Sequence, residues 1–420
     1  MRRAIPALLL ALCTGCGGSA DKQVMDSVKE QLRPVTTVAG APSDRLAQSS
    51  PQTGANDTQA LGVFEGRAAA ATRSGLFASS SSQVDVLTQV PVYLEDGGVV
   101  ESGSGTTGGV AFIARRGSSG ALVVADQGLF HDQDGILVRS PLSETLYGKQ
   151  VFALDAYGAA SDEELWLLSA EGLLHVGNNQ LTHIAIAGLT AQPEAAVGIG
   201  PGGALVVESG SLYEIHLAEG TATRIMKNVG HVASFERAED GTVYFATDSG
   251  LVQVSKSGEL SLHTLAADGA PAKSVSAVVA AYGAVAVATD WDVLALESSG
   301  AVRIGSASGV ISHGLAIDTN GDTFAATTGG LLRFKTGQPV SFTGAKPFFS
   351  THCMSCHRTG INSAPVINFE DYETARTWGP EALKRLNGIN VSPMPPPNIE
   401  TLTAADYAVV TRWVGGGMAP

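Results

Sequence analysis

One phrase recurs along the middle of the 420-residue chain and constrains its fold more than any other feature. An apolar, β-rich run is followed by a short polar turn, most often ending in glycine, and then by a second alternating run. Copies lie at residues 121–130, 165–174, 243–252 and 324–332, with weaker ones through Ser211, Asp292 and Gly75. From 128 to 330, successive turns are 38 to 44 residues apart. The chain therefore repeats with a period near 40 residues.

Short alternating strands at this period predict four-stranded blades. Glycine suits the tight turns because it adopts positive φ without steric cost. One blade cannot bury both of its faces, so several blades must stack around an axis and close into a ring. The sequence predicts a mainly β fold, a β-propeller over residues 59–344 in which seven blades fit better than six. Its repeats resemble sensor-type and WD-like propellers in architecture only.

The first residues have the layout of an export signal, with basic Arg2 and Arg3, an apolar run over residues 4–12, and a small-residue cleavage region. This start resembles a bacterial lipoprotein signal, which implies a signal peptide over 1–15 and acylation of Cys16, although Cys13 stands where that family usually has Leu. Plain secretion without a lipid is the alternative. Residues 16–58 are then expected to be a lipid-anchored flexible tether, with one short helix over 24–32. The expected location is the cell envelope, on the periplasmic side or at the outer membrane.

Charge and cysteine placement exclude two other classes of protein. The chain has 26 Lys and Arg against 40 Asp and Glu, a formal net charge of −14. Nucleic-acid binding is not expected, because it depends on basic side chains that displace counterions from phosphates. The four cysteines stand at 13, 16, 353 and 356, so they form no framework of structural disulfides.

Cysteine and histidine meet in one motif near the C-terminus. Cys353, Cys356 and His357 form the Cys-x-x-Cys-His pattern of covalent c-type haem attachment. One helical turn at this spacing sets two thiols against the vinyl groups of one porphyrin, while the adjacent imidazole reaches the iron. A zinc site needs two further ligands, and no Cys or His follows His357. A thioredoxin-like motif needs a βαβ surround, which this Pro- and Gly-rich tail does not supply.

The second axial ligand is predicted by elimination. His352 is too close along the same helix to reach the opposite face of the haem. Met354 lies between the attachment cysteines, and Met418 is third from the end. Met394 is flanked by prolines, which stiffen a loop suited to presenting one side chain. We expect Met394 to ligate the iron; the alternative is a methionine that packs beside a five-coordinate iron.

With these motifs, residues 346–417 resemble a small class I cytochrome c. The resemblance implies an all-α domain over 345–420 with a first helix over 347–352 and a closing helix from Thr403. Residues 407, 410, 413 and 414 recur at helical spacing, so the closing helix should pack on the first. The family also implies a backbone carbonyl near Pro365 as acceptor for His357 Nδ1. The interval from His357 to Met394 is short, which would leave one haem edge more exposed.

Inside the propeller, His231 and His313 each precede an expected inner strand and can face the channel. A surface or hydrogen-bonded role is favoured over catalysis for both histidines. Residues 318–322 suggest a calcium loop, but Gly329 stands where the last acidic ligand belongs, so a turn is expected.

Three functions remain open. The favoured one is an envelope-anchored electron carrier with one haem c, whose propeller serves as a docking or ligand-binding module, and whose redox partner the sequence does not identify. The alternatives are a quinohaemoprotein-like dehydrogenase with a substrate site in the propeller, and a sensory or binding propeller with a haem reporter. An electron carrier is expected rather than a substrate-specific enzyme.

Overall fold

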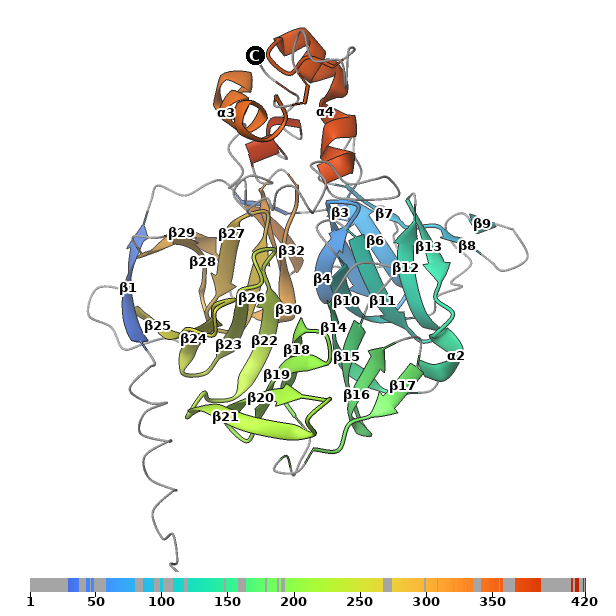
Figure 1. The fold of residues 1–420 in the computed structure, drawn as a ribbon, viewed down its shortest axis with the longest axis vertical. Helices are drawn as coiled ribbons and strands as arrows, with labels where there is room; N and C mark the ends of the chain where they lie inside the picture. Colours follow the sequence, from blue (N-terminus) through green and yellow to red (C-terminus); the bar gives the residue numbers. More distant parts are fainter. Residues whose placement is uncertain are drawn as a thin grey trace, which may run out of the picture.

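The computed structural model describes the greater part of the chain. The described residues are 29–37, 43–45, 47–48, 58–79, 86–93, 99–100, 109–116, 120–133, 135–146, 149–157, 164–177, 180–186, 189, 193–266, 274–297, 300–307, 309–319, 321–328, 330–334, 341–354, 356–357, 367–386, 409–410, 412–414, 418 and 420. They form a ring of sheets and a separate set of helices, which Figure 1 shows outside the ring.

Seven antiparallel blades form the ring (Figure 1). Blades 1 to 3 are β4 (Thr58–Phe64), β5 (Arg67–Thr72), β6 (Gly75–Ser79) and β7 (Val86–Gln89); β10 (Val110–Arg116), β11 (Gly120–Ala125), β12 (Gly128–Gln133) and β13 (Ile136–Arg139); and β14 (Val151–Tyr157), β15 (Glu164–Ser169), β16 (Gly172–Gly177) and β17 (Gln180–His183). Blades 4 and 5 are β18 (Ala195–Gly200), β19 (Gly203–Glu208), β20 (Ser211–His216) and β21 (Thr221–Lys227); and β22 (Val232–Arg237), β23 (Val243–Thr247), β24 (Gly250–Val254) and β25 (Leu260–Ala266). Blade 6 is β26 (Ala277–Ala281), β27 (Ala284–Ala288), β28 (Asp292–Glu297) and β29 (Gly300–Ser306), and blade 7 holds β30 (Val310–Ile317), β31 (Thr323–Thr327) and β32 (Gly330–Phe334).

The first strand of each blade lies on the inside of the ring, and successive first strands contact one another around the axis. We call the face at which these inner strands begin the start face. Between blades 2 and 3 the chain forms a short helix, α2 (Ser143–Leu146), and the outer edge of blade 2 carries β8 (Val92–Tyr93) and β9 (Val99–Val100). The prediction of a mainly β propeller is confirmed, with seven blades.

The N-terminal segment pairs with the outer edges of four successive blades. Strand β1 (Lys29–Thr37) runs parallel to β25 of blade 5 and then to β29 of blade 6. Strand β2 (Ser43–Arg45) is antiparallel to β32 and becomes the fourth strand of blade 7, and β3 (Ala47–Gln48) pairs with β7 of blade 1. We call these three strands the N-terminal belt.

The N-terminal belt differs from the tether and short helix that the sequence predicted for residues 16–58. Part of the expected helix over 24–32 is instead the start of β1, and part of the expected tether forms sheet. The physical reason is that blade 7 has only three strands of its own and would leave the backbone groups of β32 unpaired at an edge. Cys16 lies outside the described residues.

Hydrophobic clusters between blades hold the ring together. Buried side chains of β4 to β6 pack on those of β10 to β12, and similar clusters join each later blade to the next. The ring closes where Leu61, Ala70 and Phe77 of blade 1 pack on Ala316, Phe324 and Leu331 of blade 7. Stability is thus shared among neighbour contacts, as expected for a repeat architecture.

The repeated turn between the second and third strands has a recurring hydrogen bond. A hydroxyl at the end of the second strand donates to the carbonyl three residues later, over 2.7–3.3 Å; the donors are Thr72, Ser169, Thr247, Thr289 and Thr327. In four of these turns the accepting residue is glycine, with φ between +107° and +132°. The glycine turns predicted from the repeat are confirmed.

The described part of the C-terminal segment is helical. Helix α3 (Phe342–His352) follows N-cap Ser341 and begins five residues before the expected Pro347, and α4 (Tyr372–Leu386) was not expected as a helix. Residues 409–410 and 412–414 are also helical. Val410 and Trp413 are fully buried, and the Trp413 ring packs on Phe342 and Phe349 of α3. The predicted packing of the closing helix on the first helix is confirmed.

Among the described residues, no helix is long and apolar enough to span a membrane. The propeller and the helical segment have separate buried apolar clusters. The cluster around α3 and α4 shares no residue with the clusters of the blades.

Candidate functional site

The Cys-x-x-Cys-His motif follows directly from the last turn of α3. The Cys353 backbone N–H donates to the Phe349 carbonyl over 2.9 Å, which continues the helix into the motif. The Cys356 and His357 N–H groups both donate to the Cys353 carbonyl, over 3.1 and 2.9 Å. The motif is therefore wound as one helical turn, and Cys353 and Cys356 are not joined in a disulfide.

His357 lies against an aromatic cluster. Its ring is edge-on to Phe369, with centroids 5.8 Å apart, and Phe369 stacks on Phe349 of α3 at 4.8 Å. Burial, and secondly the positive charge of Arg385, hold the pKa of His357 below its ordinary value. The side chain is thus held in the neutral form, which is the form of imidazole that ligates metals.

The Nδ1 atom of His357 is buried and has no hydrogen-bond partner among the described residues. A buried polar atom without a partner needs an explanation, because its desolvation is otherwise uncompensated. The sequence predicts an acceptor near Pro365, which lies outside the described residues, as does Met394. A covalently held haem fits this set of groups, which consists of the two thiols, the neutral imidazole and the aromatic wall of Phe349 and Phe369. Separately, the described residues contain no group of three or more His, Cys, Asp or Glu side chains that could hold a metal ion.

A second site lies at the axis of the propeller. Strand β30 pairs Val310 with Thr327 and Leu315 with Ala325, so residues 311–314 bulge out of the ladder. His313 in this bulge has φ +55°, an uncommon value for a residue with a side chain. Its ring meets the edges of Phe112 of blade 2 and Phe235 of blade 5, with centroids 4.8 and 6.0 Å away. The bulge therefore carries the imidazole from blade 7 across the channel, where the sequence indicated that His313 can lie. The surface or hydrogen-bonded role favoured from the sequence is wrong for His313, because its ring packs between two phenylalanines and makes no hydrogen bond to a described residue.

The bulge is held by specific contacts. The Ser312 hydroxyl donates to the Ala233 carbonyl of blade 5. A side chain at Gly314 would place its Cβ 2.6 Å from the Ile311 carbonyl oxygen, so only glycine fits there. Burial lowers the pKa of His313 to about 4, which keeps the ring neutral at pH 7.

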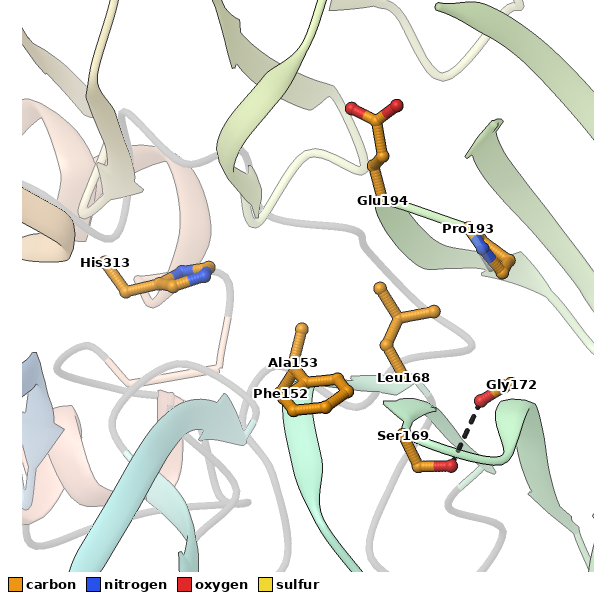
Figure 2. Close-up of a pocket in the computed structure, with 8 residues that line it drawn as sticks. All are labelled: Phe152, Ala153, Leu168, Ser169, Gly172, Pro193, Glu194 and His313. Carbon is orange, nitrogen blue, oxygen red and sulfur yellow. Dashed lines mark hydrogen bonds between the residues drawn. The ribbon is translucent and has the colours of Figure 1, made fainter. Parts of the chain in front are cut away.

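Beside His313 is a pocket of about 210 Å³ on the start face. Its lining comes from blades 3, 4 and 7: Phe152, Ala153, Leu168, Ser169, Gly172, Pro193, Glu194 and His313. Figure 2 shows the His313 ring directed at the space between Phe152 and Glu194, with the Glu194 carboxylate turned away from Phe152. Ser169 and Gly172 are joined by the turn hydrogen bond described above.

Glu194 links the pocket to blade 5. Its Oε2 accepts the Val232 N–H over 3.0 Å and lies 2.8 Å from His231 Nδ1. His231 is therefore an exposed residue of the rim, which agrees with the surface role favoured from the sequence. Asp318 and Asp322 lie at the ends of the expected turn, in which the Asp322 N–H donates to Asp318 Oδ1 over 2.9 Å. Sequence reasoning missed Glu194 and Phe152, because no local pattern marks them.

No family model and no curated protein matches the chain. Solved structures do match over about 70% of it. The extracellular domain of a one-component system from B. thetaiotaomicron is 15% identical with a TM-score of 0.49, and this chain spans only 40% of that domain. Streptogramin B lyase is 10% identical with a TM-score of 0.48 over 96% of its length, and the WD40 β-propeller domain of Doa1 is 14% identical with a TM-score of 0.45 over 96%. These similarities concern the fold alone.

Proposed function

We infer that the C-terminal segment holds one haem c through thioethers at Cys353 and Cys356, with His357 as one axial ligand and Met394 as the other. A haem held in this way supplies reversible one-electron transfer, and two protein ligands leave the iron no open position for a substrate. The chain would then act as an electron carrier in the cell envelope, anchored by acylated Cys16.

The observation that carries this proposal is the placement of His357 after one helical turn from Cys353. The turn fixes the imidazole next to both thiols, and the aromatic wall of Phe349 and Phe369 keeps water from one side of it. The lowered pKa leaves a nitrogen lone pair available at neutral pH. A purely structural role at a helix end would not explain why His357 is neutral and half-buried, with an Nδ1 atom that has no partner among the described residues.

Attachment is tested by replacing both thiols. Cys353→Ala with Cys356→Ala should abolish haem staining after denaturing electrophoresis, because only thioethers keep haem on an unfolded chain. The far-UV spectrum should keep its β signal, since neither cysteine contacts a blade cluster. Haem staining that persists in this double variant would overturn the assignment.

The Met394 assignment needs its own test, because a five-coordinate iron would also give covalent haem. Met394→Ala should remove the weak sulfur-to-iron absorption band of the oxidised protein that the cytochrome resemblance implies, and should lower the reduction potential, since thioether ligation favours reduced iron. Met418→Ala is the matched control and should change neither. A band that survives Met394→Ala would reject this ligand.

A second candidate function is favoured by the axial pocket. Residues from three blades line one partly apolar pocket, which suits a propeller that binds a small molecule. The redox state of the haem would then report that a ligand is bound, or the haem would exchange electrons with the ligand. Haem reduction that responds to a bound ligand would support this function, and ligand-independent electron exchange with small dyes would support the carrier alone.

A further inference from the structure

The β30 bulge places His313 in the lining of the axial pocket. A regular first strand in blade 7 would leave His313 within the ladder, whereas residues 311–314 leave it and cross toward blades 2 and 5. The bulge holds His313 at positive φ and requires glycine at 314. Backbone strain of this kind persists only where surrounding contacts enforce it, and it is typical of binding sites.

Two polar side chains of the lining, His313 and Glu194, have atoms that make no hydrogen bond to a described residue. Neither ring nitrogen of His313 makes a hydrogen bond to a described residue, although the ring is largely buried. Glu194 uses Oε2 for Val232 and His231, while Oε1 has no contact of this kind within the described chain. Among the described lining residues, Glu194 is the one acidic side chain, and neither Lys nor Arg is present; His313 is neutral at pH 7.

The remaining lining is apolar and partly exposed. Phe152 is 56% exposed although it is a large hydrophobic side chain, and Leu168, Ala153 and Pro193 continue the same wall. Phe152 is the bulged residue of β14, between Val151 and Ala153, which directs its ring to the start face. An aromatic side chain held open beside a cavity offers a stacking surface to a ligand.

We propose that this pocket binds a small organic cation, a single aromatic or aliphatic ring joined to a protonated amine. The ring packs on Phe152 and Leu168, and the ammonium group reaches Glu194 at the rim. His313 donates to or accepts from a polar substituent facing the axis. A volume of 210 Å³ equals about seven water volumes at roughly 30 Å³ each, which matches a one-ring ligand.

Charge favours a cation over other ligands of this size. An anion would face the Glu194 carboxylate with no Lys or Arg among the described lining residues to pair with it, and the formal net charge of −14 repels anions over longer range. The site goes beyond the proposed electron transfer because it stands on propeller residues alone, and all of its residues lie at least 30 positions before Cys353.

The test uses the full chain and a pair of probes with opposite charge. Phenethylamine and hydrocinnamate have the same ring and similar length, but one ends in an ammonium group and the other in a carboxylate. Titration calorimetry should show saturable, millimolar or tighter binding of phenethylamine and none of hydrocinnamate. Haem staining of the same preparation separates this outcome from any failure of haem attachment.

Variants locate the site. Glu194→Gln keeps an acceptor for the Val232 N–H but removes the charge, and should weaken phenethylamine binding at least tenfold. Glu214→Gln is the matched control, since Glu214 also pairs with a histidine, His216, at 3.2 Å but lies outside the pocket. Phe152→Ala removes the exposed ring without opening the core and should weaken binding several-fold.

Three outcomes overturn the proposal: no saturable binding of phenethylamine, equal binding of hydrocinnamate, or folded Glu194→Gln protein that binds within twofold of the unchanged chain. If Glu194→Gln does not fold, Phe152→Ala decides, because its ring is exposed and its loss cannot disturb the inter-blade clusters. Unchanged binding in that variant rejects the site.

Discussion

The propeller and the C-terminal segment reach a buried core by different means. The blades share six clusters of mostly aliphatic side chains, each extending from one blade to the next. The C-terminal segment has one cluster, in which five of nine buried residues are aromatic: Phe342, Phe348, Phe349, Phe369 and Trp413. Repetition distributes stability over many small contacts, whereas the helical segment concentrates it in a few large ones. A lost contact should therefore matter more in the second part than in the first.

Separating the two parts is the most drastic way to test this contrast. A fragment of residues 341–420 should mature with haem and exchange electrons with small redox dyes, while a fragment of residues 29–340 should fold without colour. A fragment of residues 58–340 should be measurably less stable than 29–340, because it lacks the N-terminal belt and leaves β32 as an open edge. Denaturant unfolding followed by circular dichroism compares the two propeller fragments.

If the helical fragment loses its haem spectrum while the full chain keeps it, the two parts form one cooperative unit and the contrast fails. If residues 58–340 and 29–340 unfold at the same denaturant concentration, the N-terminal belt contributes nothing to the closure of the ring.

The aromatic cluster is tested at its centre. Trp413→Ala should lower the unfolding free energy of the C-terminal segment by about 3–5 kcal/mol, because it removes a fully buried ring that packs on Phe342 and Phe349. The propeller transition should not move. Trp291→Ala is the control, since this propeller tryptophan is 64% exposed. A shift of both transitions in Trp413→Ala would show that the cores are coupled.

A repeated turn is the corresponding test in the propeller. Gly250 has φ +132°, and a Cβ there would lie 2.7 Å from the His263 carbonyl oxygen. Gly250→Ala should destabilise the propeller by about 2–3 kcal/mol without changing the haem spectrum. Gly200→Ala provides the comparison, because a Cβ at Gly200 meets nothing within 4 Å. Equal stability of the two variants would mean that the turn tolerates a side chain.

The smallest expected effect concerns pH. Burial lowers the pKa of His313 to about 4, against about 6.5 in the unfolded chain. The unfolded state therefore takes up a proton first, and the contribution of His313 to stability, complete above pH 6.5, is lost as the pH falls toward 4. Between pH 7 and 5 the loss is about 2 kcal/mol.

His313→Asn should flatten that part of the pH profile of the propeller, and asparagine tolerates the positive φ of this position. The transition of the C-terminal segment should keep its own pH dependence. Identical slopes for the propeller in the two proteins, measured by denaturant unfolding at pH 7 and pH 5, would contradict the buried, neutral state of His313.

Sequence reasoning predicted the features that depend on neighbours along the chain. The blade period and the glycine turns at 128, 172, 250 and 330 arise from local alternation, and the burial of Val410 and Trp413 follows from helical spacing. Attachment by Cys353 and Cys356, ligation by His357 and Met394, and acylation of Cys16 stay predictions.

The missed features depend on distant partners. Strand β2 pairs with β32, nearly 290 positions away, and nothing in the local pattern around Ser43 indicates that pairing. Helix α4 was missed because Gly379 and Pro380 are typical helix breakers. In the fold, a Cβ at 379 would lie 3.0 Å from Trp413, so glycine allows the closing helix to approach α4. Glu194 lines the same pocket as His313 only because the blades close into a ring.

If Cys16 is acylated, the position of β1 also limits how far the propeller can lie from the bilayer. Lys29, where pairing with blade 5 begins, is thirteen positions after Cys16. A fully extended chain of that length spans at most about 45 Å. An acyl group on Cys16 would thus keep the rim of blades 5 and 6 within one small-protein diameter of the lipid surface. With that anchor and the proposed haem, a soluble redox partner would have to approach the membrane surface to exchange an electron.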